Sequence, residues 1–233
     1  ISQFCFSQIE ISRYPNGALI TSGTVLASNV LNLQSEIGFK VRNIGSTTTN
    51  VWVRCQDLVN NNGTQFQLCF GAECLDGVVV GQVYPSVGVV LAPNETNGNF
   101  DHFLNNNAGN AVFPLDFVFK FFQTNQATQG GAEVGNSFIV TYRYNPNLST
   151  DEINQLQTSG VIVKSTIVEN ELVLDVLKST TMSIYDLNGK MVYNSKLNYG
   201  IQTIDVSDFS SGVYVINFTN AEGNSSNKKI IKK

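Results

Sequence analysis

Four cysteines have the residue type and spacing to form covalent or metal bonds in this 233-residue chain: Cys5, Cys55, Cys69 and Cys74. In an exported chain an even number of cysteines favours disulfides, and four cysteines allow three connectivities. The tight turn Phe-Gly-Ala-Glu can bring Cys69 within bonding reach of Cys74, which leaves Cys5 for Cys55. The rival is a four-thiolate zinc site, but such sites usually use two closely spaced cysteine pairs and only one is present.

His102, the only histidine, is the candidate for a general base. A catalytic histidine needs a nucleophile or a carboxylate within hydrogen-bond reach. Asp101 adjoins it, but successive residues of a strand point to opposite faces. The sequence therefore favours a surface histidine.

Carboxylates offer two further kinds of site, a glycosidase pair and a calcium loop. The acidic residues of the first part are scattered singly beside turns: Glu10, Glu36, Asp57, Glu73, Asp76, Glu95, Asp101, Asp116 and Glu133. Solvated charge is the usual explanation of such a pattern. Calcium could bind at Asp57 to Asn62 or around Asp101, but the alternating spacing of a calcium loop is missing, so turns are favoured. We expect no catalytic residue, metal or cofactor.

Exposed aromatic rings could form a carbohydrate platform, with Trp52, Tyr84 and Tyr14 as candidates. Trp52 is expected on the strand face opposite Val51 and Val53. The only tryptophan of a β-sandwich is more often part of the core, which we favour here.

Strands must position these residues, and short apolar runs broken by Gly, Asn and Pro predict where the strands lie. The spacing of the runs is typical of a β-sandwich. Alternation at Ile37, Phe39 and Val41 and at Phe117, Phe119 and Phe121 places these side chains in one core. Strands are expected at residues 5–13, 22–27, 37–43, 51–58, 65–69, 78–83, 87–91, 99–104, 117–124 and 137–144.

Composition limits the function classes. The chain has 42% hydrophobic and only 14% charged residues, as in a turn-rich β protein. Its net charge of −4 argues against nucleic acid, which needs a basic face. No apolar run is long enough for a transmembrane helix. Because the sequence starts at Ile1 without a signal segment, we expect that a signal peptide has been removed.

The strand pattern stops between Asn145 and Gly160. Ser149 and Glu152 have the spacing of a capping box, which predicts a short helix ended by Gly160. We expect an all-β fold of two immunoglobulin-like β-sandwiches, at residues 1–145 and 161–233, joined by a short polar linker at 146–160.

The last third contains a hairpin signal. Apolar alternation before and after Asn188-Gly189 predicts two strands joined by a type I′ turn, and Gly212 to Phe218 predicts another strand. Together, IYDLNGK at 184–190, IDVSDFSSGVYVINF at 204–218 and KKIIKK at 228–233 resemble the type A C-terminal sorting domain of the type IX secretion system of Bacteroidota.

This resemblance implies that residues 161–233 are an address without chemistry of their own. The translocon and an outer-membrane shuttle barrel would read it, and a cell-surface sortase would cleave within 145–160, leaving the protein at the cell surface or outside the cell. The residues implied in the sorting signal are Asp186, Gly189, Lys190, Gly212, Val213, Tyr214, Lys228, Lys229, Ile230, Ile231, Lys232 and Lys233.

The first domain resembles secreted immunoglobulin-like modules in GFKVRNIG at 38–45, the strand from Val51 to Cys55, and LAPNETNGNFDH at 91–102. We expect a non-enzymatic cargo that binds a glycan or protein ligand through asparagine-rich loops at 60–63, 94–99 and 105–110. The alternatives are a carbohydrate-binding or adhesin module with Trp52 in its platform, a small hydrolase, and a subunit retained by the secretion apparatus.

Overall fold

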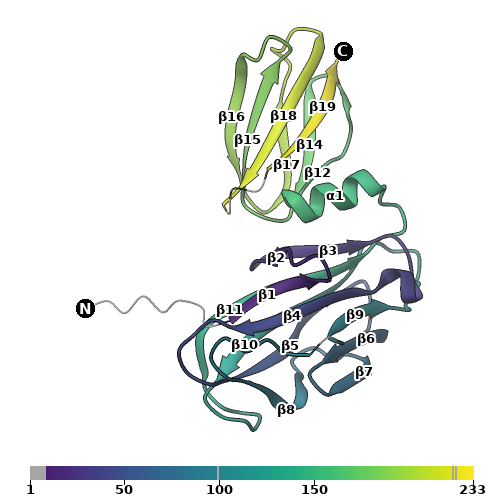
Figure 1. Cartoon of the computed structure of the whole chain (residues 1–233). Coiled ribbons are helices and arrows are strands. Elements are labelled where there is room, and N and C mark those ends of the chain that lie inside the picture. Colours follow the sequence, from purple (N-terminus) through teal and green to yellow (C-terminus); the bar gives the residue numbers. More distant parts are fainter. Residues whose placement is uncertain (1–8, 99, 222, 224) are drawn as a thin grey trace. The chain divides into compact units, whose positions relative to one another are not determined.

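The computed structural model describes residues 9–98, 100–221, 223 and 225–233 of an almost entirely β-stranded chain (Figure 1). It divides into two compact units, Ile1–Asn147 and Leu148–Lys233. No helix in these described ranges is both long and apolar enough to span a membrane. Each unit has its own hydrophobic core.

The first unit is a sandwich of two sheets. The six-stranded sheet has the order β2-β1-β4-β9-β6-β7, with β1 (Ile9–Tyr14), β2 (Leu19–Ile20), β4 (Ile37–Asn43), β6 (Thr64–Phe70), β7 (Glu73–Gly77) and β9 (His102–Asn105). The five-stranded sheet has the order β3-β11-β10-β5-β8, with β3 (Thr24–Ser28), β5 (Thr49–Val59), β8 (Val83–Leu91), β10 (Leu115–Thr124) and β11 (Glu133–Tyr144). A 3-10 helix, η1 (Asn32–Ser35), precedes β4.

Aromatic rings from both sheets fill the space between them. Phe66 stacks on Phe117 at 4.0 Å between ring centroids, and Phe103 stacks on Phe119 at 5.0 Å. Phe39 packs edge-on against Phe121. The predicted alternation is confirmed, because Ile37, Phe39 and Val41 and the three phenylalanines of β10 are all buried. Burying a side chain of this size stabilises a fold by about 2 kcal/mol or more.

Most expected strands are present, but the one at 78–83 is wrong. Val78 enters the core while Val79 and Val80 are exposed, and the Gln82 amide donates to the Val79 carbonyl in a turn. The valine run therefore belongs to the connection between β7 and β8, and β7 itself was not expected. The expected strand at 5–13 begins partly outside the described residues, which show it from Ile9 to Tyr14.

The corner after β4, in the segment GFKVRNIG, depends on Asn43, which is fully buried. Its Nδ2 donates to the carbonyls of Thr47 and Leu91, and its Oδ1 accepts from the Gly45 amide. One side chain therefore satisfies the buried backbone where β4 turns toward β5.

The second unit contains a three-stranded sheet, β12-β14-β17, and a five-stranded sheet, β13-β19-β18-β15-β16. Their bounds are β12 (Val161–Val163), β13 (Ile167–Val168), β14 (Glu171–Val176), β15 (Thr180–Asp186), β16 (Met191–Leu197), β17 (Gly200–Asp205), β18 (Gly212–Asn220) and β19 (Ser225–Lys232). Leu172, Leu174, Ile184, Ile216 and Phe218 form its core from both sheets.

The predicted hairpin is β15–β16, but its turn is not type I′. Only Gly189 of the pair Asn188-Gly189 has a positive φ, +79°. Asp186 Oδ1 instead accepts from the Asn188 and Lys190 amides at 2.8 and 2.9 Å. The Asp186 carboxylate accepts the hydrogen bonds of these two backbone amides. The connection between β15 and β16 is therefore longer than a two-residue turn.

The expected short helix is α1 (Thr150–Thr158), which begins with the predicted capping box. Ser149 Oγ accepts from the Glu152 amide, and the Ser149 amide donates to Glu152 Oε2 at 2.9 Å. Gly160, with φ +71°, follows its end. Leu156 is buried, so the segment expected as a polar linker is folded as part of the second unit.

Candidate functional site

An open groove of about 500 Å³ in the first unit is lined by amide and hydroxyl side chains. Its walls are the loop that enters β6 and the loop that leaves β9: Asn60, Asn61, Asn62, Thr64, Gln65, Asn107, Gly109 and Asn110. The volume lies within the range of about 300 to 1,000 Å³ typical of small-molecule sites. Two of the three predicted asparagine-rich loops therefore meet in one site.

The two walls are hydrogen bonded to each other. The Asn106 amide donates to the Gln65 carbonyl at 2.8 Å, and Asn107 Nδ2 donates to the Thr64 carbonyl at 3.0 Å. Asn60 and Gln65 have φ values of +58° and +57°, which non-glycine residues rarely adopt. Such backbone is retained where surrounding contacts fix it, often at functional sites.

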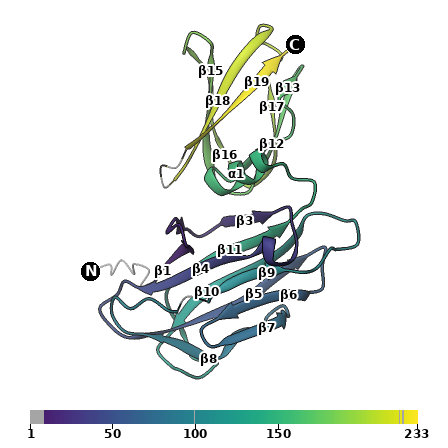
Figure 2. The same cartoon turned by 45° about the vertical axis from the view of Figure 1, so that its right-hand side comes forward.

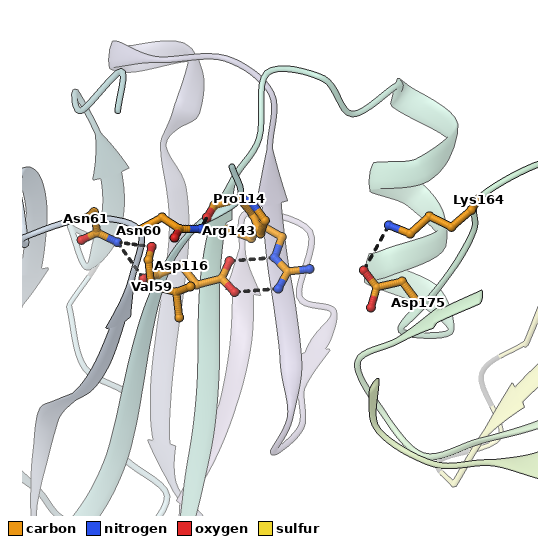
Figure 3. A network of polar contacts seen from close by, with 8 residues as sticks. All are labelled: Val59, Asn60, Asn61, Pro114, Asp116, Arg143, Lys164 and Asp175. Atoms are coloured by element: carbon orange, nitrogen blue, oxygen red, sulfur yellow. Dashed lines mark hydrogen bonds and ion pairs between the residues drawn. The ribbon is translucent and has the colours of Figure 1, made fainter. Parts of the chain in front are cut away.

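Asn60 and Asn61 are anchored at the residues where β10 begins (Figure 3). Asn60 Nδ2 donates to the Pro114 carbonyl at 2.9 Å, and Asn61 Nδ2 donates to the Asp116 carbonyl at 2.9 Å and to the Val59 carbonyl at 2.8 Å. The Asp116 side chain meanwhile forms a buried bidentate ion pair with Arg143. The loop of Asn60 and Asn61 is thus attached to Asp116, whose buried carboxylate is neutralised by Arg143.

The third asparagine-rich loop does not line the groove. Asn97 is buried, its Oδ1 accepts from the Val41 amide at 2.7 Å, and its Nδ2 donates to Asp101. The Asn94 amide donates to the Asn43 carbonyl. These hydrogen bonds attach the loop to β4.

Thr64 and Gln65 also line the groove but were not predicted to do so. Their residue types do not indicate a backbone turn at the start of a strand.

His102 lies on β9 with both ring nitrogens at oxygen atoms. Nδ1 is 2.8 Å from the Phe100 carbonyl and Nε2 is 2.9 Å from Gln67 Oε1. The side-chain nitrogen Nε2 of Gln67 in turn donates to Asp76 Oδ1 at 3.0 Å. Among the described residues, no nucleophilic side chain hydrogen bonds to this imidazole.

The acidic residues proposed for a catalytic pair are engaged separately. Glu133 pairs with Arg54 and Lys120, at 2.9 and 2.6 Å, and these cations lower the pKa of its carboxyl against the opposing effect of burial. Asp101 is buried, and burial raises its pKa to about 7, although the Gly71 amide donates to it. Within the described ranges, no group of three or more His, Cys, Asp or Glu side chains is placed to hold a metal ion.

Cys69 and Cys74 form the expected disulfide across β6 and β7, with their Cα atoms 4.1 Å apart. Cys5 lies outside the described residues, so the proposed Cys5–Cys55 bond cannot be placed. Cys55 is a buried free thiol in the described part of the chain, and burial raises its pKa to about 11.

The three aromatic side chains proposed for a carbohydrate platform do not form one exposed surface. Trp52 is 1% exposed and its Nε1 donates to Thr124 Oγ1 at 2.9 Å. A Cβ added at Gly88 would lie 2.6 Å from its ring, so the chain at Gly88 packs directly on the indole. Tyr84 is also buried, and only Tyr14 is exposed, beside Lys40.

In the second unit, the predicted basic segment at 228–233 forms most of the last strand, β19. β19 pairs antiparallel with β18 from Ser225 to Lys232 and parallel with β13 on its other side, and Figure 2 shows β18 and β19 side by side. Ile230 is buried, whereas Lys229 and Ile231 are exposed. On the other sheet Lys164 contacts Asp175 at 3.2 Å (Figure 3).

Residues 161–233 match the family described as secretion system C-terminal sorting domain. This part of the chain is a type IX secretion sorting domain. The match confirms the resemblance seen in the sequence and supports export of the chain as a cargo of that system.

Two groups can be distinguished among the predicted residues of the sorting domain. Asp186, Gly189 and Tyr214 hold turns, since the Tyr214 hydroxyl donates to the Ser210 carbonyl at 2.9 Å. Lys229 and Ile231 instead lie opposite Val215 and Val213 on the outward face of the five-stranded sheet. This outward group is exposed in the folded domain, as are Lys190, Gly212 and Lys233. The remaining predicted residues are Gly212, which begins β18, Lys190 at the hairpin, the buried Ile230, Lys228, Lys232 and Lys233.

No curated protein sequence matches this chain. Among solved structures, the YadV chaperone aligns over 96% of this chain and 99% of its own at 10% identity and a TM-score of 0.43. A structure of the Salmonella enterica SafA pilin with the SafB chaperone aligns over 99% and 97% at 9% identity and a TM-score of 0.39. The periplasmic chaperone SfaE aligns over 91% and 97% at 9% identity and 0.39. Likeness at these scores carries no functional argument.

Proposed function

We propose that this protein is a type IX cargo whose first unit is a non-catalytic binding module at the cell surface or outside the cell. The sorting domain would be read by the translocon and the outer-membrane shuttle barrel, and a cell-surface sortase would act near residues 145–160. The first unit would bind its ligand in the groove between the loops at 60–65 and 107–110.

The groove is the observation that carries the binding role. It brings together two loops that are far apart in sequence and joined by a hydrogen bond between Thr64 and Asn107, 43 residues apart, and it leaves exposed amides at its surface. Its lining has no ionisable side chain, whereas general acid–base catalysis requires a titratable group in contact with the substrate. We therefore favour recognition over hydrolysis at this site.

Localisation tests the proposal. The full chain with a cleavable signal peptide, and the same chain lacking residues 148–233, are expressed in a host with a type IX system. The full chain should reach the surface or the medium and the truncated chain should stay in the periplasm. A full chain that instead copurifies with the translocon after secretion is complete would support the retained-subunit alternative and contradict the cargo role.

A further inference from the structure

We propose that the groove binds an uncharged glycan, through the side chains of Gln65 and Asn110 and the free ends of the Asn60 and Asn62 amides. This inference rests on the proposed binding role and names the ligand class. It follows from sorting the amides of the groove into those already hydrogen bonded and those that are not.

Asn61 and Asn107 are structural. Both ends of the Asn61 amide are used, since Nδ2 donates to the carbonyls of Val59 and Asp116 and Oδ1 accepts from the Gly63 amide at 3.0 Å. Both ends of the Asn107 amide are also used, because Nδ2 donates to Thr64 and Oδ1 accepts from the Gly109 amide at 2.8 Å. These two side chains hold the walls and have little capacity left for a ligand.

The ligand-facing groups are fewer. Asn60 donates to Pro114 but its Oδ1 has no donor within the described residues, and Asn62 accepts from Thr64 but its Nδ2 has no acceptor there. The amides of Gln65 and Asn110 are exposed and make no hydrogen bond to another described residue. The groove therefore offers as many free amide NH₂ groups as free amide oxygens. Asn62 contributes one NH₂ group, Asn60 contributes one oxygen, and Gln65 and Asn110 contribute one of each.

This balance selects the chemistry of the ligand. A sugar hydroxyl both donates and accepts, so it can use an amide NH₂ and an amide oxygen side by side. A phosphate, sulfate or carboxylate would find no cation in the lining, and burying its charge without a partner is costly. A cation would likewise find no carboxylate in the lining, since the nearby Asp116 is already paired with Arg143.

The walls are also fixed before the ligand arrives. The hydrogen bonds from Asn106 to Gln65 and from Asn107 to Thr64 join them, and the anchors on Pro114 and Asp116 hold the first wall to β10. Less conformational freedom is then lost on binding, which favours a ligand that offers only hydrogen bonds.

The test uses the full chain on an array of neutral hexose and N-acetylhexosamine oligosaccharides, with acidic oligosaccharides beside them, followed by titration calorimetry with the neutral oligosaccharide that binds. Gln65→Ala and Asn110→Ala should each lower affinity by about tenfold, since each removes about one hydrogen-bonding side chain. Asn125→Ala changes an exposed asparagine outside the groove and should bind as the parent does. Circular dichroism of each variant should be unchanged.

Binding of acidic glycans alone would overturn the inference, as would neutral-glycan binding that survives both groove substitutions or the absence of any neutral-glycan binding. These results leave the proposed function standing if the chain is displayed at the surface and Gln65→Ala abolishes capture of a protein ligand. A chain that remains in the periplasm contradicts the proposed function whatever the array shows.

Discussion

Arg143 and Asp116 lie directly opposite each other on β11 and β10 and form a buried bidentate ion pair, with Nε 2.7 Å from Oδ1 and a terminal nitrogen 2.6 Å from Oδ2. The Asp116 carbonyl accepts the hydrogen bond that anchors Asn61. The ion pair that joins β10 to β11 and the wall of the groove therefore meet at Asp116.

We predict that Arg143→Met destabilises the first unit by about 3 to 5 kcal/mol, because it leaves the Asp116 charge buried and unpaired. Urea denaturation measures the loss. The double variant Arg143→Met with Asp116→Leu should recover much of it, and Arg42→Met, at an exposed position of β4, should change little. If Arg143→Met were as stable as the parent, the ion pair would contribute nothing to the stability of the first unit.

Asp101 should make the stability of the first unit depend on pH. Burial raises its pKa to about 7 from an ordinary 3.8, so between these values the folded chain keeps a proton that the unfolded chain releases. The unfolding free energy therefore falls as pH rises from about 4 to about 7 and is level above that, by at most about 4 kcal/mol. The hydrogen bond from the Gly71 amide favours the charged form and already offsets part of the effect of burial on this pKa.

The measurement compares the parent with Asp101→Asn by urea denaturation at several pH values. The difference between the two unfolding free energies should change across pH 4 to 7 in the direction that stabilises the parent at low pH. A constant difference, or one of opposite sign, would show that Asp101 is not held protonated by burial.

The Cys69–Cys74 disulfide closes a short loop, with a sequence separation of 5. The loop-entropy relation gives about 2 kcal/mol for a loop of this size. The double variant Cys69→Ser, Cys74→Ser should lose about that much in urea, and the reductant dithiothreitol should produce the same shift in the parent and none in the variant. Equal shifts in both proteins would mean that another bond is being reduced.

The sequence predicts the elements of this fold better than their connections. Alternation fixed the bounds of β4 at Ile37–Asn43, because one face of that strand is buried throughout. The run Val78-Val79-Val80 gave a false strand, since apolar type alone does not show that Val79 and Val80 are exposed. At the hairpin, Asn188-Gly189 located the turn, but its form is set by the hydrogen bonds of Asp186.

The candidate site was predictable only in part. Asparagine-rich loops were expected to carry recognition, and those at 60–63 and 105–110 do line the groove. Their convergence depends on β6 pairing with β9, which is a long-range contact that residue type does not reveal. The loop at 94–99 differs because the Asn97 side chain is buried and hydrogen bonded to the Val41 amide and the Asp101 carboxyl. Trp52 is covered by the chain at Gly88.

Recognition of the sorting domain by the secretion machinery should depend on its outward sheet face at β18 and β19. We predict that Lys229→Glu blocks export and leaves the chain in the periplasm, because Lys229 is exposed beside Ile231 and Val215 on that face. Lys196→Glu makes the same charge change on the same sheet face, since Lys196 pairs through Thr181 with Thr219, but it lies on the edge strand β16 away from β19 and should export normally. Cell fractionation measures both. Deleting residues 228–233 would be less informative, since it removes most of β19 from between β18 and β13.

The most direct test of the account is whether residues 145–233 carry the export address by themselves. They are fused after a periplasmic reporter with a signal peptide, in a host with a type IX system, and surface exposure of the reporter is measured by protease accessibility in intact cells. We predict that this fusion reaches the surface and that a fusion of residues 1–147 does not. A reporter that stays protected in the periplasm with 145–233 attached would contradict the account.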